Sequence, residues 1–228
     1  MAEKESPKLN LEEPLGTGSG SGLKSKMSES NRKLLIFIKF ILGVCLLPFV
    51  YTVSVSFLKQ FSLIDPAIQN NFWWGVVTFI LIYLFVWEPV IIYVKGQKLL
   101  ELIFTFFKPL VRVAPYLLPI YTILLVIIYG VISWTIKGLF GYFIFFLGFT
   151  IAFHLVFSAK TLRSKKEDFF KTNYLFGFSL VYILNLLVLS FALGNIFDKF
   201  SFVALCTDSY QIAQDIFNAV FTQLFINK

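Results

Sequence analysis

Four ionisable side chains stand inside long runs of apolar residues, and they are the first candidates for chemistry in this chain. They are Glu88, His154, Asp208 and Asp215. A charge within the hydrocarbon of a membrane is costly, so such groups usually face a bundle interior, a partner charge or a water-filled cavity. Together the four could line a path that carries protons, ions or a small or lipidic molecule.

Glu88 is the most unusual of the four, because Pro89 follows it directly in "FVWEPVIIYV". The proline removes a backbone donor, so a kink is expected at the charge. Desolvation raises the pKa of a carboxyl group. We therefore expect Glu88 to be protonated or paired with a cation.

Amide and acidic residues add further candidates at membrane depth. Asn185 can hydrogen-bond across a helix interface for about 1 kcal/mol, and we expect it to fix helix packing. Near the end of the chain, polar residues recur at steps of three and four, which places them on one face of a helix. They are Asp208, Gln211, Asp215, Asn218 and Thr222.

This last helix could span the membrane, line a polar cavity, pack against a partner or lie flat at the interface. Helices that lie on lipid usually carry Lys and Arg on their polar face. Here the stripe is acidic and amide. The sequence therefore favours an inward-facing or subunit-facing helix.

The elements that must position these residues are membrane helices. The 228 residues are 57% hydrophobic and 14% charged, whereas a soluble domain is about half apolar and about a quarter charged. A helix needs about 20 apolar residues to cross the hydrocarbon. Six windows qualify: Leu34–Leu58, Phe72–Val94, Val113–Ile136, Leu139–Ala159, Tyr174–Leu193 and Phe202–Ile226. With no alternating strand pattern, the sequence predicts an all-α, polytopic membrane protein with about six transmembrane helices over residues 34–228.

The charges outside these windows predict the orientation. Residues 1–33 carry eleven charges and the tract "GTGSGSG", a composition typical of a disordered, flexible tail. With this tail in the cytoplasm, sixteen Lys and Arg residues lie on the cytoplasmic side and three on the other. This positive-inside pattern predicts that both termini are cytoplasmic. The partner of the basic residues is then the lipid bilayer with its anionic headgroups, and not nucleic acid.

Two segments, "YVKGQKLLELIFTFFKPLVRVAPYLLPIYTILL" and "LGFTIAFHLVFSAKTLRSKKEDF", resemble membrane-embedded zinc metalloproteases of the site-two protease type. They are most similar to a bacterial branch with a Tyr-Val-x-Gly-His-Glu-Leu-Thr-His helix, an Ala-Pro-Tyr-x-x-Pro-x-Tyr-Thr segment and an Ala-Phe-His-Leu-x-Phe helix. The resemblance covers roughly residues 72 to 190. The matched residues are Tyr93, Val94, Gly96, Leu99, Ala114, Pro115, Tyr116, Pro119, Tyr121, Thr122, Ala152, Phe153, His154, Leu155 and Phe157.

The resemblance also marks what this chain lacks. In active members, two histidines four residues apart bind zinc and the glutamate after the first polarises the attacking water. Gln97, Lys98 and Glu101 stand at those three positions here. Glutamine is a poor zinc ligand, lysine brings a positive charge to a cation site, and no base is left. The segment between Glu101 and Ala114 is also shorter than its counterpart in the family.

These departures imply a degenerate member that is not an enzyme and needs no cofactor. The first hypothesis is a pseudoprotease-like scaffold or subunit, which binds a membrane-protein partner or forms an oligomer. The alternative is the conduit lined by Glu88, His154, Asp208 and Asp215. The third is a rearranged metalloprotease with Glu101, His154 and Asp168 as ligands, which the presence of one histidine in the whole chain makes a poor zinc site. The resemblance implies a bacterial inner membrane.

Overall fold

The computed structural model describes residues 29–106, 114–132, 138–164 and 174–225, and every regular element within these ranges is a helix. In chain order they are α2 (Glu29–Phe61), α3 (Pro66–Phe85), α4 (Val90–Ile103), α6 (Ala114–Leu117), α7 (Ile120–Ile132), α8 (Phe140–Ser164), α9 (Tyr174–Ile196) and α10 (Phe202–Phe225). The predicted all-helical architecture is confirmed.

Four of the described helices are long and apolar enough to cross a membrane, where six were expected. They lie at Leu34–Phe61, Pro66–Phe85, Phe140–Arg163 and Tyr174–Ile196. A shorter apolar helix covers Ile120–Ile132. The difference in number arises in the third and last of the six predicted windows, while the second window is shifted to Pro66–Phe85.

The second and third windows are broken by proline, so each holds two helices, and at Pro89 the kink expected from the sequence is a complete break. In the window Phe72–Val94, α3 ends at Phe85 and α4 begins at Val90. Pro89 cannot donate to the carbonyl of Phe85, and its ring clashes with that carbonyl, so the first helix stops there. In the window Val113–Ile136, Pro119 separates the four-residue α6 from α7 in the same way.

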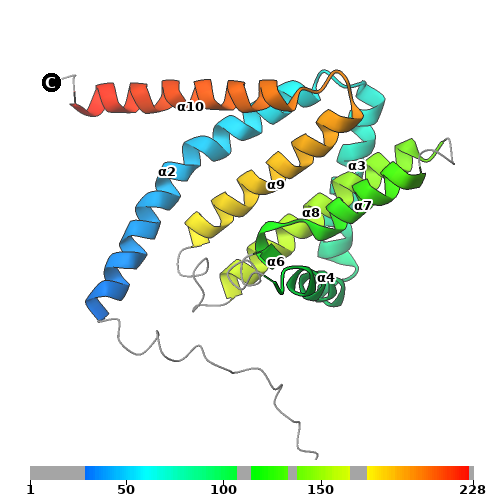
Figure 1. Cartoon of the computed structure of the whole chain (residues 1–228), viewed down its shortest axis with the longest axis horizontal. Helices are drawn as coiled ribbons and strands as arrows, with labels where there is room; N and C mark the ends of the chain where they lie inside the picture. The colour runs from blue at the N-terminus through cyan, green and yellow to red at the C-terminus, as the bar shows by residue number, and fades with distance from the viewer. Residues whose placement is uncertain (1–28, 107–113, 133–137, 165–173, 226–228) are drawn as a thin grey trace, which may run out of the picture.

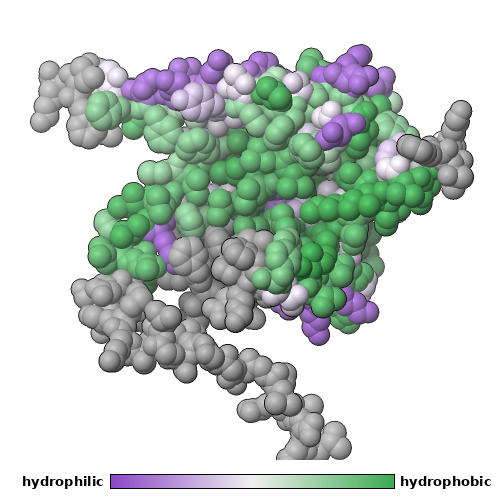
Figure 2. All heavy atoms as spheres, viewed as in Figure 1, coloured by the Kyte–Doolittle hydropathy of each residue, from purple (hydrophilic) through white to green (hydrophobic). Residues whose placement is uncertain are grey.

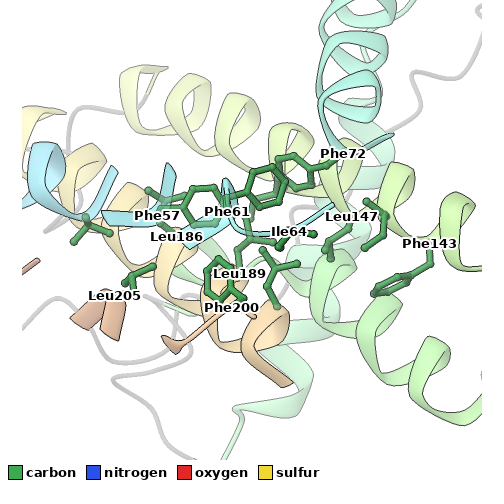
Figure 3. Close-up of a cluster of buried hydrophobic side chains, with 14 residues drawn as sticks. Phe57, Phe61, Ile64, Phe72, Phe143, Leu147, Leu186, Leu189, Phe200 and Leu205 are labelled. Atoms are coloured by element: carbon green, nitrogen blue, oxygen red, sulfur yellow. The ribbon is translucent and has the colours of Figure 1, made fainter. Parts of the chain in front are cut away.

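The long helices form one bundle in which α2, α9, α8 and α7 run side by side, while α3 crosses α8 and α4 lies at the opposite end from α10 (Figure 1). A cluster of buried side chains joins α2, α3, α8, α9 and α10 (Figure 3). Its labelled members are Phe57, Phe61, Ile64, Phe72, Phe143, Leu147, Leu186, Leu189, Phe200 and Leu205. Five helices thus share a single apolar core near the end of the bundle that carries α10.

The crossing of α3 and α8 depends on two glycines, Gly75 and Gly148. A Cβ added at Gly75 would lie 1.9 Å from the carbonyl oxygen of Phe145, and one added at Gly148 would lie 2.1 Å from that of Phe72. The two backbones are therefore in direct contact. Small residues at membrane-helix interfaces allow backbones to approach this closely. Such packing matters in a membrane because lipid supplies no hydrophobic force that would press helices together.

This contact predicts that Gly75→Ala and Gly148→Ala destabilise the protein strongly, because the methyl group meets main-chain atoms that have no rotamer to change. Overpacking typically costs about 1–3 kcal/mol, and we expect values at the upper end in unfolding titrations of the purified protein in micelles. Gly130→Ala on α7 is the matched control, since a Cβ there meets nothing within 4 Å. Equal stabilities of the three variants would contradict the close crossing.

Candidate functional site

A buried polar cluster forms where α4, α6 and α8 meet. Tyr93 comes from α4, the main-chain carbonyl of Tyr116 from α6, and His154 and Ser158 from consecutive turns of α8. The side chains of Tyr93, His154 and Ser158 are 4%, 4% and 0% exposed. The cluster therefore unites the three sequence segments on which the protease resemblance rests.

Hydrogen bonds link all four groups. The hydroxyl oxygens of Tyr93 and Ser158 are 3.1 Å apart, and Ser158 donates to the Tyr116 carbonyl at 3.3 Å. His154 Nε2 lies 3.3 Å from the same carbonyl and 3.2 Å from Ser158 Oγ. Because a carbonyl oxygen can only accept, Nε2 must carry the proton that it donates to Tyr116.

The Tyr116 carbonyl needs these donors because Pro119 breaks the helix that would otherwise supply one. In this break the amide of Ile120 donates to the carbonyl of Leu118 at 3.0 Å, and not to Tyr116 one full turn earlier. Backbone groups freed inside a membrane protein must find partners on neighbouring helices. His154 and Ser158 provide them for Tyr116.

Asn185 does the same for the next carbonyl. Its Nδ2 donates to the Leu117 carbonyl at 3.1 Å and to the Val181 carbonyl, in its own helix, at 2.7 Å. Asn185 is fully buried, and its bond to Leu117 joins α9 to α6. This is the cross-helix contact expected of Asn185 from the sequence.

The three positions of the degenerate motif do not converge on His154. Gln97 is half-buried one turn after Tyr93 on α4, and its Nε2 is buried without a hydrogen-bond partner in the part of the chain that the structure describes. Lys98 and Glu101 are exposed on the outer face of α4.

A metal site does not form within the described ranges, where no three His, Cys, Asp or Glu side chains are grouped closely enough to hold an ion. Asp168, the third ligand considered from the sequence, lies outside the described residues. His154 is thus placed among hydroxyl and carbonyl groups, and Glu101 on a different surface of the bundle.

The four candidate conduit residues lie in separate places. Glu88 stands in the break between α3 and α4, exposed, and pairs with Lys160 on α8. Asp208 pairs with Lys59 at 2.8 Å near the end of α2, and Asp215 is exposed on α10. Since α4 and α10 lie at opposite ends of the bundle (Figure 1), the structure does not join these residues into one path.

Of the inward-facing and subunit-facing positions that the sequence favoured for the stripe on α10, the structure does not have the inward-facing one. Asp208 is half-buried at its ion pair, and the rest of the stripe is exposed: Gln211, Asp215, Asn218 and Thr222. The buried positions of α10 are instead Leu205, Ser209 and Ala213. The polar face of this helix therefore points away from the bundle.

Pairing decides the charge state of Glu88. The hydrogen bond from Lys160 lowers the pKa of Glu88 below its usual value, with partial desolvation opposing the shift and Tyr83 adding to it. Of the two states expected from the sequence, the structure has the paired one. Because the break is exposed, the desolvation that remains does not offset the bond from Lys160.

Ser158 belongs to the cluster but was not singled out from the sequence. The signal that points to it is local: His154 and Ser158 are four residues apart in an otherwise apolar helix, so they lie on one face. Pro119 indicates that backbone carbonyls in the preceding turn lack their usual helical donors. Nothing in the spacing says that the two features meet.

Comparison with family models, with curated proteins and with solved structures finds no significant match to this chain.

Asn185→Ala tests whether the cluster holds the broken helix together. It leaves the Leu117 carbonyl buried without its donor, which costs about 1–3 kcal/mol of unfolding free energy. Asn195→Ala is the matched control, because Asn195 makes the same bond to a carbonyl four residues earlier, at 2.6 Å, but on an exposed part of α9. We expect about 0.5 kcal/mol or less there; equal losses would show that Leu117 does not depend on Asn185.

The Glu88–Lys160 pair predicts a pH dependence of stability. Because the pKa of Glu88 is lower in the folded protein than its ordinary value of 4.5, the pair stabilises the fold above that pH and loses its effect as the pH falls below it. We expect Glu88→Gln to lower Tm slightly at neutral pH and low salt, and the gap from the original protein to close in acid. Glu101→Gln, on the exposed face of α4, should leave Tm unchanged at every pH.

Proposed function

We propose that this chain is a non-catalytic membrane protein that serves as a scaffold or subunit of a membrane complex. The observation that carries the proposal is the engagement of His154. Its Nε2 donates to the Tyr116 carbonyl, so the one imidazole of the chain is used to satisfy a proline-broken helix. With Nε2 bonded to that carbonyl, only Nδ1 could bind zinc, and the described part of the chain groups no three His, Cys, Asp or Glu side chains that could hold an ion.

The surroundings of His154 support the same proposal. A metalloprotease needs two or three further ligands and a base that polarises water. The nearest motif position is Gln97, whose amide lies beside the phenol of Tyr93, while Lys98 and Glu101 face outward. An arrangement of hydroxyl, amide and carbonyl groups can hold helices in register, and the Ser158 hydroxyl, although 3.2 Å from His154 Nε2, is fully buried, where a substrate does not reach it.

A partner has an accessible element in α4. This helix of 14 residues lies at one end of the bundle (Figure 1) and packs through Tyr93, Gly96 and Leu100. Its outer face presents exposed Ile91 and Leu102 together with Lys95 and Lys98. We propose that this mixed apolar and basic face contacts the partner where the membrane surface meets the cytoplasm. The membrane is proposed to be a bacterial inner membrane, which rests on the sequence resemblance.

The test is purification of the full chain from its native membrane in a mild detergent, after chemical cross-linking. We expect a second membrane protein, or a second copy of this chain, in stoichiometric amount. Lys98→Glu should reduce its recovery, while Lys199→Glu, exposed beyond the end of α9, should not. Recovery of free monomer alone would contradict the scaffold.

Metal analysis of the same preparation tests the absence of catalysis separately. We expect zinc far below one ion per chain. Full zinc occupancy that is lost in His154→Ala but kept in Asn185→Ala would overturn the non-catalytic assignment, whatever partner is found.

A further inference from the structure

Helix α10 has three faces of different character. One face packs on the bundle through the buried Leu205, Ser209 and Ala213. The polar stripe that begins at Asp208 occupies a second. The third face is open and carries exposed apolar side chains, with Val203 73% exposed, Tyr210 66% and Phe221 58%, and exposed Gln214 lies beside them. At about 100° per residue, the three apolar residues lie within a narrow arc about 100° around the helix from the centre of the stripe, and this arc and the packed face together cover the side opposite the stripe.

The position of α10 is set by two contacts at its first turns. Lys59, at the end of α2, pairs with Asp208 at 2.8 Å. Gln60 accepts from the backbone amide of Ser201 at 3.1 Å, which fixes the turn between α9 and α10. From this corner α10 runs across the end of the bundle instead of back along α9 (Figure 1).

The surface of the molecule divides along this helix. Figure 2 shows hydrophilic residues gathered along the outer edge of α10, and a broad apolar region on the bundle side of it. That region includes α2, whose exposed side chains are apolar along most of its length. The open face of α10 is continuous with it, since the rings of Phe49 on α2 and Phe217 on α10 lie 5.6 Å apart.

We propose that α10 lies flat in the surface of the bilayer, with its open apolar face among the lipid chains and its stripe in water. The occupant of the apolar face is therefore lipid. A spanning α10 would place Asp215, near its midpoint, at the centre of the hydrocarbon, where an unpaired carboxylate is costly. In the flat arrangement every member of the stripe reaches water, and the apolar arc meets the same medium as α2.

The chemistry of α10 also specifies the lipid surface. Residues 202–225 contain Asp208 and Asp215 but no Lys or Arg, so the helix has no attraction to anionic headgroups. Its binding depends on buried apolar area, and zwitterionic phosphatidylcholine is enough. The first turns of α10 contact the C-terminal end of α2. Since α2 spans the membrane, α10 lies on the face of the membrane opposite the start of α2. The end of α10 is then on the opposite side of the membrane from the start of α2, whereas charge alone predicts that both termini are cytoplasmic.

Depth measurements on the full chain in phosphatidylcholine vesicles test this placement. The two native cysteines are first removed by Cys45→Ser and Cys206→Ser. In this background one residue at a time, Tyr210, Gln211, Asn218 or Phe221, is replaced by a cysteine that carries a spin label. Labels at Tyr210 and Phe221 should be relaxed mainly by lipid-dissolved oxygen, and labels at Gln211 and Asn218 mainly by a water-soluble nickel chelate. Matched labels at exposed Leu42, Tyr51 and Leu58 on α2 should instead follow a depth gradient along the chain.

Each other pattern would overturn the proposal. A gradient along α10 like that of α2 means that α10 spans. Labels at Tyr210 and Phe221 that neither reagent reaches mean that protein, such as a second copy of the chain, covers this face. If the difference between the two faces appeared only with anionic lipid in the vesicles, the inference that α10 binds through its apolar area without cationic side chains would be wrong.

Sidedness gives an independent readout in sealed vesicles of known orientation. A membrane-impermeant maleimide should label Asn218→Cys from one side and Lys98→Cys from the other. Labelling of both variants from the same side would exclude the opposite placement of α10. Neither result depends on whether the protein has a partner or binds zinc.

Discussion

The structure depends on one constraint, which is that backbone groups within a membrane bundle must be paired by protein. Pro119 breaks the helix between α6 and α7 and leaves carbonyls without their usual donors. The Tyr116 carbonyl is met by His154 and Ser158 of α8, and the Leu117 carbonyl by Asn185 of α9. Most of the buried polar chemistry in this region therefore serves the backbone, and it ties α4, α6, α8 and α9 together at one place.

The charged groups follow the complementary rule. The described ion pairs lie at exposed ends of helices: Glu88 with Lys160 at the end near α4, and Lys59 with Asp208 at the end near α10. Ion pairs at such positions contribute little stability, but they fix where a helix begins or turns. On the face that Figure 2 shows, the surface between them is mainly apolar. The charges thus mark the two edges of an apolar belt, and do not form a route through it.

This distribution bears on function. The segments that resemble site-two proteases meet in space, around Tyr93 and His154, as functional segments of an enzyme would. Tyr93, His154 and Ser158 bond to one another or to the Tyr116 carbonyl, while Lys98 and Glu101 face away. A helix junction whose polar groups bond mainly to one another suits the proposed role, in which the protein acts through binding. The accessible surfaces for binding are then α4 at one end and α10 at the other.

The sequence by itself determined the class of fold and the positions of the breaks. Apolar runs of membrane-helix length and the local effect of Pro89 and Pro119 act within one or two turns, so no distant residue is needed to infer them. Only the tertiary structure decided which side chain reaches which free carbonyl, that Asp208 pairs with Lys59, 149 residues away, and that α10 turns across the bundle. These outcomes depend on helix crossings such as that of α3 and α8 at Gly75, where contact between the two backbones sets the geometry. Periodicity places a residue on a face of its helix, but the neighbour that this face meets is a property of the packed bundle.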